Sequence, residues 1–202
     1  MFENAIELGP QFARSHRADA DQIAAITADA FRRDPFNTWL FGNFAAMHMA
    51  FRALARHQYT ERGFSYRLGD EGAAMWMMPG GNSAFPIRAL PSFLWAGLTK
   101  ASRGGIGRLL KTANAMEGNH PAYEHAYLFT IGVRGSAQGK GLGRKLIQPV
   151  LDACDQQKIP AYLENSNPEN CGFYRSCGFE RITMIHPLPQ SPPLEAMVRK
   201  PR

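Results

Sequence analysis

The sequence contains few cysteines and no long apolar run. Its 202 residues include only Cys154, Cys171 and Cys177, an odd number whose spacing matches no metal site. We therefore expect the reduced thiols of a cytoplasmic protein rather than disulfide bonds. No apolar stretch approaches the ~18 residues that a membrane span needs, and the N-terminus lacks the basic and apolar regions of a secretory signal.

A strong excess of charge is also missing. The chain has 23 Lys and Arg residues against 17 Asp and Glu, a net charge of +6 at pH 7. This balance permits an anionic ligand, but the basic residues are not interleaved with aromatic ones as in RNA-binding modules. The histidines show no metal-ligand spacing either. We expect no metal ion, and neither a nucleic-acid nor a membrane partner.

The apolar pattern that is present predicts a single domain over 1–202. Hydrophobic residues make up 45% of the chain, which is enough for a core without disulfide staples. The first part of the pattern predicts an extended stretch at 11–16, helices at 18–34 and 43–62, and a hairpin at 64–68 and 73–78.

The second part of the pattern predicts an insertion followed by alternating strands and helices. Residues 82–125 are expected to form a helical insertion with helices at 87–98 and 109–117. Strands are expected at 127–133, 161–164, 179–186 and 196–199, and helices at 142–158 and 169–176. This order predicts an α/β fold with a mixed central β-sheet flanked by helices.

A glycine-rich turn, Gln138–Gly143, lies between the expected strand 127–133 and the following helix. Glycines let the backbone approach a ligand, and a helix N-terminus adds unpaired N–H donors, so such a turn can bind phosphate. The turn is not a Walker loop, because Gly141 rather than Ser or Thr follows Lys140. It is not a dinucleotide fingerprint, because Arg144 stands where the third glycine belongs. An ordinary strand–helix turn remains the structural alternative.

The turn and its surroundings resemble a known family. Gln138, Gly141 and Gly143 match the Q/R-x-x-G-x-G/A turn of acyl-CoA-dependent acetyltransferases. Further matching segments follow the same order along the chain: Thr130–Val133, Leu163-Glu164, Asn170–Tyr174 and Cys177–Phe179. The sequence thus resembles the GNAT (Gcn5-related N-acetyltransferase) superfamily, and within it the puromycin N-acetyltransferase type of small-molecule acetyltransferase. The resemblance implies a GNAT fold, in which two central strands splay apart around coenzyme A.

The resemblance also implies a set of residues that bind acetyl-CoA. The backbones of Ile131 and Val133 would pair with the pantetheine arm, and the Val133 N–H would face the thioester oxygen. Asn170 would contact the same arm, or else only begin a helix. The pyrophosphate would be held by the turn and its basic neighbours: Arg134, Gln138, Gly139, Lys140, Gly141, Leu142, Gly143 and Arg144.

Tyr174 matches the general acid of the family, and Glu164 is a candidate base because of its position in the sequence. Tyr174 would protonate the leaving thiolate, although it could simply pack beside Phe173. Glu164, at the end of a buried strand, would take the proton of the amine, or instead make a structural hydrogen bond.

Four further residues are candidates for contact with the acceptor. Asp34 could attract a cation or only stop a helix, and Trp76 could stack on an aromatic acceptor or only pack in the core. His125 and Tyr127 could relay a proton through water, while a core role remains open for His125.

The combined expectation is an N-acetyltransferase that moves the acetyl group of acetyl-CoA to a primary amine of a small molecule. Two alternatives remain open: acetylation of a protein N-terminus or lysine, and a GNAT-like module that binds coenzyme A without chemistry. We expect the protein to act as a monomer or a homodimer.

Overall fold

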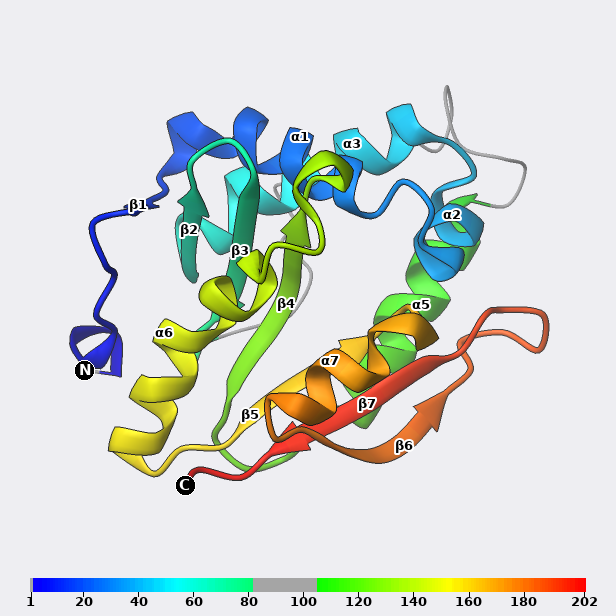
Figure 1. Cartoon of the computed structure of the whole chain (residues 1–202). Helices are drawn as coiled ribbons and strands as arrows, with labels where there is room; N and C mark the ends of the chain where they lie inside the picture. The colour runs from blue at the N-terminus through cyan, green and yellow to red at the C-terminus, as the bar shows by residue number, and fades with distance from the viewer. Residues whose placement is uncertain (1, 82–104) are drawn as a thin grey trace.

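The computed structural model describes residues 2–81 and 105–202, and within them seven strands form one sheet (Figure 1). Their order across the sheet is β1-β2-β3-β4-β5-β7-β6. The strands are β1 (Phe12–Arg14), β2 (Phe64–Leu68), β3 (Gly72–Met77), β4 (Ala126–Val133), β5 (Ala161–Asn165), β6 (Glu180–Ile185) and β7 (Leu194–Arg199). β4 and β5 pair in parallel, and the other described neighbours pair antiparallel. The predicted mixed α/β fold is confirmed.

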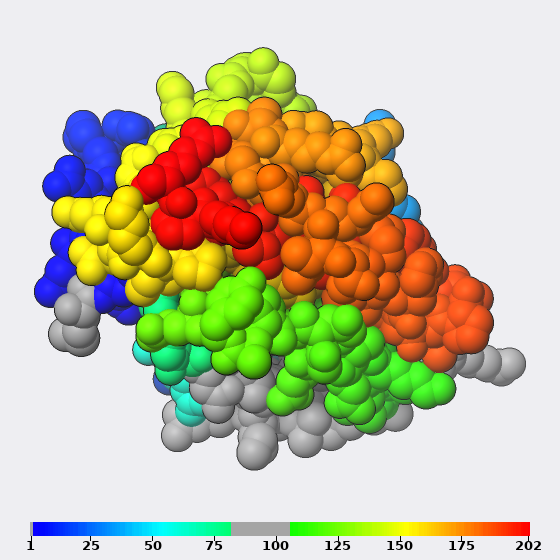
Figure 2. Space-filling view, turned by 90° about the horizontal axis from the view of Figure 1, so that it is seen from below, coloured from blue at the N-terminus to red at the C-terminus, as the bar shows by residue number. Residues whose placement is uncertain are grey.

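Helices cover both faces of this sheet. The α-helices are α1 (Ala20–Ala30), α2 (Pro35–Phe41), α3 (Phe44–Leu54), α5 (Gly105–Asn119), α6 (Leu142–Gln157) and α7 (Cys171–Ser176). The shorter turns are η1 (Phe2–Ala5), η2 (Arg17–Asp19), the π-helical η3 (Ala55–Tyr59), η5 (Gly135–Ala137) and η6 (Pro168–Asn170). Seen from below, α5 runs beside the end of the molecule that holds β6 and β7 (Figure 2). None of the described helices is long and apolar enough to cross a membrane.

Alternation along the strands divides the core into two layers. Tyr127 and Tyr162 face α1, α2 and α3, whereas their neighbours Leu128 and Leu163 face α6 and α7. This is the period of two that a sheet buried on both faces requires. The two layers meet where β4 and β5 separate.

The separation of β4 from β5 positions the site. Pairing between them is limited to Ala126–Leu128 of β4 against Ala161–Leu163 of β5, although both strands continue. On the other side of β4, Met75 pairs with Thr130 and Trp76 with Leu128, so Phe129 is an extra, bulged residue. A bulge bends its strand. The rest of β4 therefore diverges from β5 and leaves a backbone edge without a partner strand.

The structure changes one helix boundary predicted from the sequence. Asp34-Pro35 was expected to stop a helix, but α1 already ends at Ala30, and Asp34 begins α2. Its side chain accepts a hydrogen bond from the Asn37 N–H, and Pro35 occupies the first helical position, where a missing N–H costs nothing. The expected helix at 109–117 lies within the longer α5, and the one expected at 87–98 lies outside the described residues.

Candidate active site

A cavity of about 320 Å³ occupies the point where β4 and β5 separate. Its lining includes Ile131 of β4, Glu164 of β5, Asn170 just before α7 and Tyr174 within α7. Three more elements, α2, α3 and α5, also contribute lining residues. The cavity therefore joins the diverging strands to a chamber walled by helices.

Aromatic side chains form part of the helical wall, together with aliphatic ones. Phe51 packs tilted against Phe31 and edge to face against Phe41, with ring centroids 5.6 and 5.8 Å apart. Tyr59 stacks flat on the bulged Phe129, with centroids 4.4 Å apart. These contacts make a preformed apolar surface of the kind that buries the body of a small ligand.

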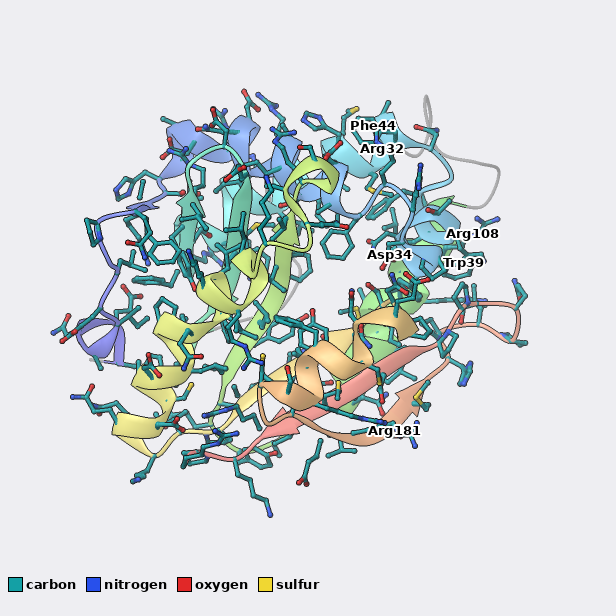
Figure 3. The ribbon with its side chains drawn as sticks, in the orientation of Figure 1. Arg32, Asp34, Trp39, Phe44, Arg108 and Arg181 are labelled. Atoms are coloured by element: carbon teal, nitrogen blue, oxygen red, sulfur yellow. The ribbon has the colours of Figure 1, made fainter. Side chains whose placement is uncertain are left out.

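An arginine fastens α5 to α2 over this chamber. The Arg108 guanidinium lies over the ring of Trp39, 5.4 Å from its centroid, and its Nη1 donates to the Trp39 carbonyl over 2.8 Å (Figure 3). The contact combines a cation–π interaction with a hydrogen bond. It holds two walls of the chamber together across a long stretch of sequence.

A buried carboxylate, that of Glu164, lies at the base of the cavity. Its side chain is 2% exposed, and its Oε1 lies 3.2 Å from Nε2 of His120, the residue that follows α5. The angles at this contact are not those of a formed hydrogen bond, so Oε1 accepts no aligned hydrogen bond from a described residue. A buried oxygen with unused acceptor capacity requires an explanation, and a bound donor group is one.

Three tyrosines surround the same carboxylate. Burial, and then the negative charge of Glu164, raises the pKa of Tyr59, Tyr127 and Tyr162. These phenols therefore stay protonated at neutral pH and act as hydrogen-bond donors rather than bases. The arrangement leaves Glu164 and His120 as the proton acceptors in this cluster.

The glycine-rich turn adopts a backbone that requires glycine at two positions. Gly139 and Gly141 have φ angles of 78° and 74°, and a Cβ added at either would meet no atom within 4 Å. Gly141 directly precedes α6, whose first N–H groups have no intrahelical partner. The turn thus presents an open, donor-rich surface that fits a phosphate group.

Similarity to known proteins agrees with this geometry. The model of the acetyltransferase (GNAT) family matches residues 91–179. An uncharacterised N-acetyltransferase of Schizosaccharomyces pombe is 31% identical over 205 residues, covering 93% of this chain and 82% of the relative. The chain belongs to the GNAT acetyltransferase family. It is therefore an N-acetyltransferase, and the co-substrate of this family is acetyl-CoA.

Two further similarities concern the fold and part of the sequence. A structure from Corynebacterium glutamicum, described as histone acetyltransferase HPA2 and related acetyltransferase, superposes with a TM-score of 0.69 at 22% identity, covering 96% of this chain and 98% of that one. At this identity the likeness establishes the fold alone. N-alpha-acetyltransferase RimI of Mycobacterium tuberculosis is 32% identical over 87 residues, covering 43% of this chain and 49% of RimI.

The acetyltransferase site has an exposed backbone edge that fits the pantetheine arm. The Arg134 N–H donates to the Glu71 carbonyl, on the β3 side of β4, over 2.8 Å. Because successive N–H groups of a strand point to opposite sides, the Val133 N–H points away from β3, toward the open side. The Val133 carbonyl on that side accepts from Gln138 Nε2 over 3.1 Å, which fastens the turn to the strand.

The basic residues predicted to bind the pyrophosphate have protein partners of their own. Arg134 Nε donates to the Asp70 carbonyl, and Lys140 lies 3.9 Å from Glu71. Arg144 bonds the carbonyl and hydroxyl of Ser176 at the end of α7, over 3.1 and 2.6 Å. These contacts order the rim of the turn, while the backbone donors of Gly141–Gly143 stay open.

Tyr174 belongs to the core layer that faces α6 and α7. It is 8% exposed, lines the cavity, and packs against Phe173 and Phe179. Burial, followed by the nearby Cys177 and Asp34, raises the pKa of its phenol above the ordinary value of 10.0. Its proton is therefore retained over the whole neutral range.

Two residues expected to contact the acceptor have other surroundings. Asp34 Oδ1 accepts from the backbone and side chain of Asn37, and Oδ2 from Ser166 Oγ over 2.7 Å, so both oxygens are occupied (Figure 3). Trp76 is fully buried with Tyr66 and Leu146 under α6 and lines neither of the two described cavities. Neither side chain faces the chamber, since Asp34 caps α2 and Trp76 fills the core.

The other two lie close to Glu164. Tyr127 is buried and lines the cavity, whereas the half-buried His125 lines a neighbouring cavity. Sequence patterns missed His120, Tyr59 and Tyr162, because a single histidine after a helix and two tyrosines in core positions carry no motif. In the described parts of the chain, no three His, Cys, Asp or Glu residues cluster as metal ligands.

Proposed function

We propose that this acetyltransferase acts on a small-molecule primary amine with an apolar body. The observation that carries the proposal is the 320 Å³ cavity, whose helical walls are aromatic and aliphatic and whose base holds the buried Glu164. Its size lies at the lower end of the range for small-molecule sites. A side chain or ligand group entering it would be enclosed by α2, α3 and α5.

The charges of the cavity suit a cationic acceptor. Most primary amines are protonated at pH 7, since their pKa values lie near ~10. Glu117 and Glu164 line the cavity, and its described lining contains no Lys or Arg. The carboxylates favour the ammonium head of an amine, and the apolar walls favour a hydrophobic remainder over a polyamine or a sugar.

Each of the chain's groups then has a defined task. Acetyl-CoA supplies the acetyl group as a thioester. The N–H groups of the turn before α6 bind its pyrophosphate, the Val133 N–H faces the oxygen that gains charge, and Tyr174 Oη gives a proton to the departing sulfur. Glu164 attracts the ammonium head of the acceptor and belongs to the base that deprotonates it.

The domain organisation, location and partners expected from the sequence belong to the same proposal. We propose one catalytic domain over 1–202 that works in the cytoplasm as a monomer or homodimer. We also propose that it needs no metal and binds neither nucleic acid nor membrane.

Acetylation of a protein N-terminus is the second candidate. The similarity to RimI, named an N-alpha-acetyltransferase, favours it, but that similarity covers 43% of this chain. The enclosed aromatic walls favour the small amine, because a peptide acceptor needs a groove that admits its backbone.

An acceptor panel tests the choice. Purified protein would be mixed with acetyl-CoA and either arylalkylamines, polyamines, aminosugars or short peptides, and free thiol would be followed. We expect kcat/KM to be highest for the arylalkylamines, by at least ~10-fold over polyamines. Highest activity on peptides would replace the proposed acceptor, and binding of acetyl-CoA without thiol release from any amine would indicate a non-catalytic module.

A further inference from the structure

We propose that His120 and Glu164 form a carboxylate–imidazole pair in which His120, oriented by Glu164, accepts the proton of the amine and releases it through a second cavity. This inference rests on the proposed function, since it names the base of that same site.

The pair is defined by its geometry. His120 Nε2 lies 3.2 Å from Glu164 Oε1, at the long end of the range for a hydrogen bond. Catalytic hydrogen bonds are often long in a ligand-free enzyme and shorten with substrate. A carboxylate oxygen accepts, so once the contact tightens Nε2 is the nitrogen that donates to Glu164, and neutral His120 then keeps a lone pair on Nδ1.

The ring of His120 is held on three sides. Tyr127 and Tyr162 meet it edge to face, with centroids 4.5 and 4.9 Å away, and His125 lies 5.6 Å away. Its side chain is 16% exposed, against 2% for that of Glu164. His120 is therefore fixed in orientation yet still reaches open space, as a base must.

Two cavities meet at this ring. His120 lines the main cavity, which holds Glu164, and also a second cavity of about 300 Å³ that holds His125 and Glu124. Tyr127 is shared by both. A proton taken up in the main cavity thus has an exit at the same residue, and it need not return past the bound substrate.

His125 is neutral on the exit side. Its Nδ1 lies 2.8 Å from the Tyr123 carbonyl, which can only accept, so Nδ1 carries the hydrogen and Nε2 a lone pair. Burial, and then the nearby His120, lowers the pKa of His125. A neutral imidazole beside His120 adds no fixed positive charge against the departing proton.

Three tyrosines and two further glutamates lie near the pair of His120 and Glu164. From the sheet and η3 these are Tyr127, Tyr162 and Tyr59, whose raised pKa values keep them neutral. Glu117 lies on α5, which precedes His120, and Glu124 lines the second cavity. Among the described groups, His120 thus contacts one carboxylate, that of Glu164, and neutral rings, so Glu164 balances a positive charge on the imidazole.

The proton balance is simple. One N–H bond of the ammonium breaks, its electron pair stays on the nitrogen, and the proton joins Nδ1 of neutral His120. The resulting imidazolium donates from Nε2 to the Glu164 carboxylate, and no proton is transferred to that carboxylate. Loss of the Nδ1 proton into the second cavity restores neutral His120, with one proton released per amine.

Single and double variants separate this arrangement from a direct carboxylate base. We expect kcat at pH 7 to fall ~10²-fold in His120→Gln, the usual scale for a positioned base, and only ~10-fold in Glu164→Gln. The double variant should be no slower than His120→Gln, because residues that act as one unit are not additive. A large loss in Glu164→Gln with near wild-type kcat in His120→Gln would overturn the proposal.

Two readouts exclude a merely structural role for His120. The wild-type kcat should rise with pH, as a reaction that needs a free base does, and that rise should be absent in His120→Gln. Added imidazole should raise the kcat of His120→Ala at least ~10-fold, since the second cavity admits a ring of that size. His186→Gln, at an exposed position after β6, should match wild type in both assays. An unchanged pH profile, or no rescue in a folded His120→Ala, would overturn the proposal.

The acceptor used for these assays keeps the two proposals apart. The variants are measured with whichever amine the wild type acetylates best, including a peptide. Wild-type refusal of small amines would thus count against the proposed acceptor alone, whereas unaltered kinetics of the variants would count against the role of His120 alone.

Discussion

Gly141 combines a left-handed φ of 74° with open space around its α-carbon. A side chain there would be strained by several tenths of a kcal/mol or more and would occupy the side from which a phosphate approaches. Gly135 lies in the same loop and also has open space, but its φ is outside the left-handed region. The two glycines therefore form a matched pair for testing the cofactor turn.

We expect Gly141→Val to weaken binding of acetyl-CoA by at least ~10-fold, about 1.4 kcal/mol. Gly135→Val should change the affinity by less than a few fold. Isothermal titration calorimetry of the two folded variants measures both. Equal affinities of the two variants for acetyl-CoA would show that this turn does not bind the pyrophosphate.

Tyr174 offers a test of acid catalysis with a matched control. Tyr174→Phe should keep affinity for acetyl-CoA and lower kcat by ~10²-fold or more. Since the pKa of Tyr174 is raised, its proton is present up to pH 10, and the wild-type rate should not fall between pH 8 and 10 through loss of this acid. Tyr66 is also buried, and its hydroxyl donates to the Leu146 carbonyl, so Tyr66→Phe should lower stability and leave kcat within a few fold. A kcat for Tyr174→Phe near that of wild type would make Tyr174 a packing residue.

At the scale of elements, α2 connects helix capping to the shape of the acceptor chamber. Asp34 caps α2 with one oxygen and binds Ser166, just after β5, with the other. Phe36 and Leu40 of the same helix line the cavity. Whatever loosens the start of α2 should therefore loosen a wall of the acceptor site.

We expect Asp34→Ala to lower the free energy of unfolding by ~1–2 kcal/mol and to raise KM for the amine several fold. The matched control is Asn43→Ala, which removes the cap of α3, where Asn43 Oδ1 accepts from the Ala46 N–H over 2.9 Å. Asn43→Ala should lower the free energy of unfolding by a similar amount without raising KM for the amine. Urea unfolding and steady-state kinetics give both quantities, and equal KM effects would make the link to Ser166 irrelevant to the site.

At the scale of the whole molecule, one ion pair joins the end of α6 to β7 and the C-terminus. Arg199, 3% exposed in its side chain, donates to both oxygens of Asp155 over 2.7 and 2.6 Å, and the Arg202 N–H donates to Oδ1. The hydrogen bond from Arg199 is the main cause that lowers the pKa of Asp155. Arg199 also donates from Nε to the Cys177 carbonyl, after α7.

The lowered pKa predicts a loss of stability in acid. The unfolded chain binds a proton at Asp155 more readily than the native one, so this contribution is complete above pH 3.8, the ordinary value, and disappears as the pH falls below it. Asp155→Asn should cost about 2 kcal/mol at pH 7, less than the ~3–5 of a fully buried pair because Asp155 is partly exposed. In this variant the free energy of unfolding should also decline less as the pH falls.

The control is Asp21→Asn, which breaks an exposed ion pair with Arg52 and should change the free energy of unfolding little. Urea unfolding curves of the two variants at pH 7 and pH 3 measure these free energies. If Asp155→Asn lost the same free energy of unfolding at both pH values, the lowered pKa of Asp155 would be wrong.

Local sequence determined most of the elements and the cofactor turn. The hairpin of β2 and β3, strand β4 and helix α6 were predicted within a few residues, because their periodicity and their glycine and proline punctuation act over neighbouring residues. The glycines of the turn were recognisable for the same reason, since a left-handed backbone is a property of a single residue. The GNAT family assignment rested on such short motifs and is confirmed.

Tertiary structure alone decided the composition of the acceptor and proton-transfer site. The bulge at Phe129 arises from a mismatch between two strands, and no pattern within β4 predicts it. Asp34 was predicted to stop a helix and instead caps the next one through the nearby Asn37 N–H, but its second oxygen binds Ser166, a contact that only the tertiary structure supplies. His120 and Glu164 lie far apart in the sequence, and only the packing of α5 against the sheet brings their side chains together. Periodicity records which face of an element is apolar, whereas the contacts that make a site depend on how those faces are placed in space.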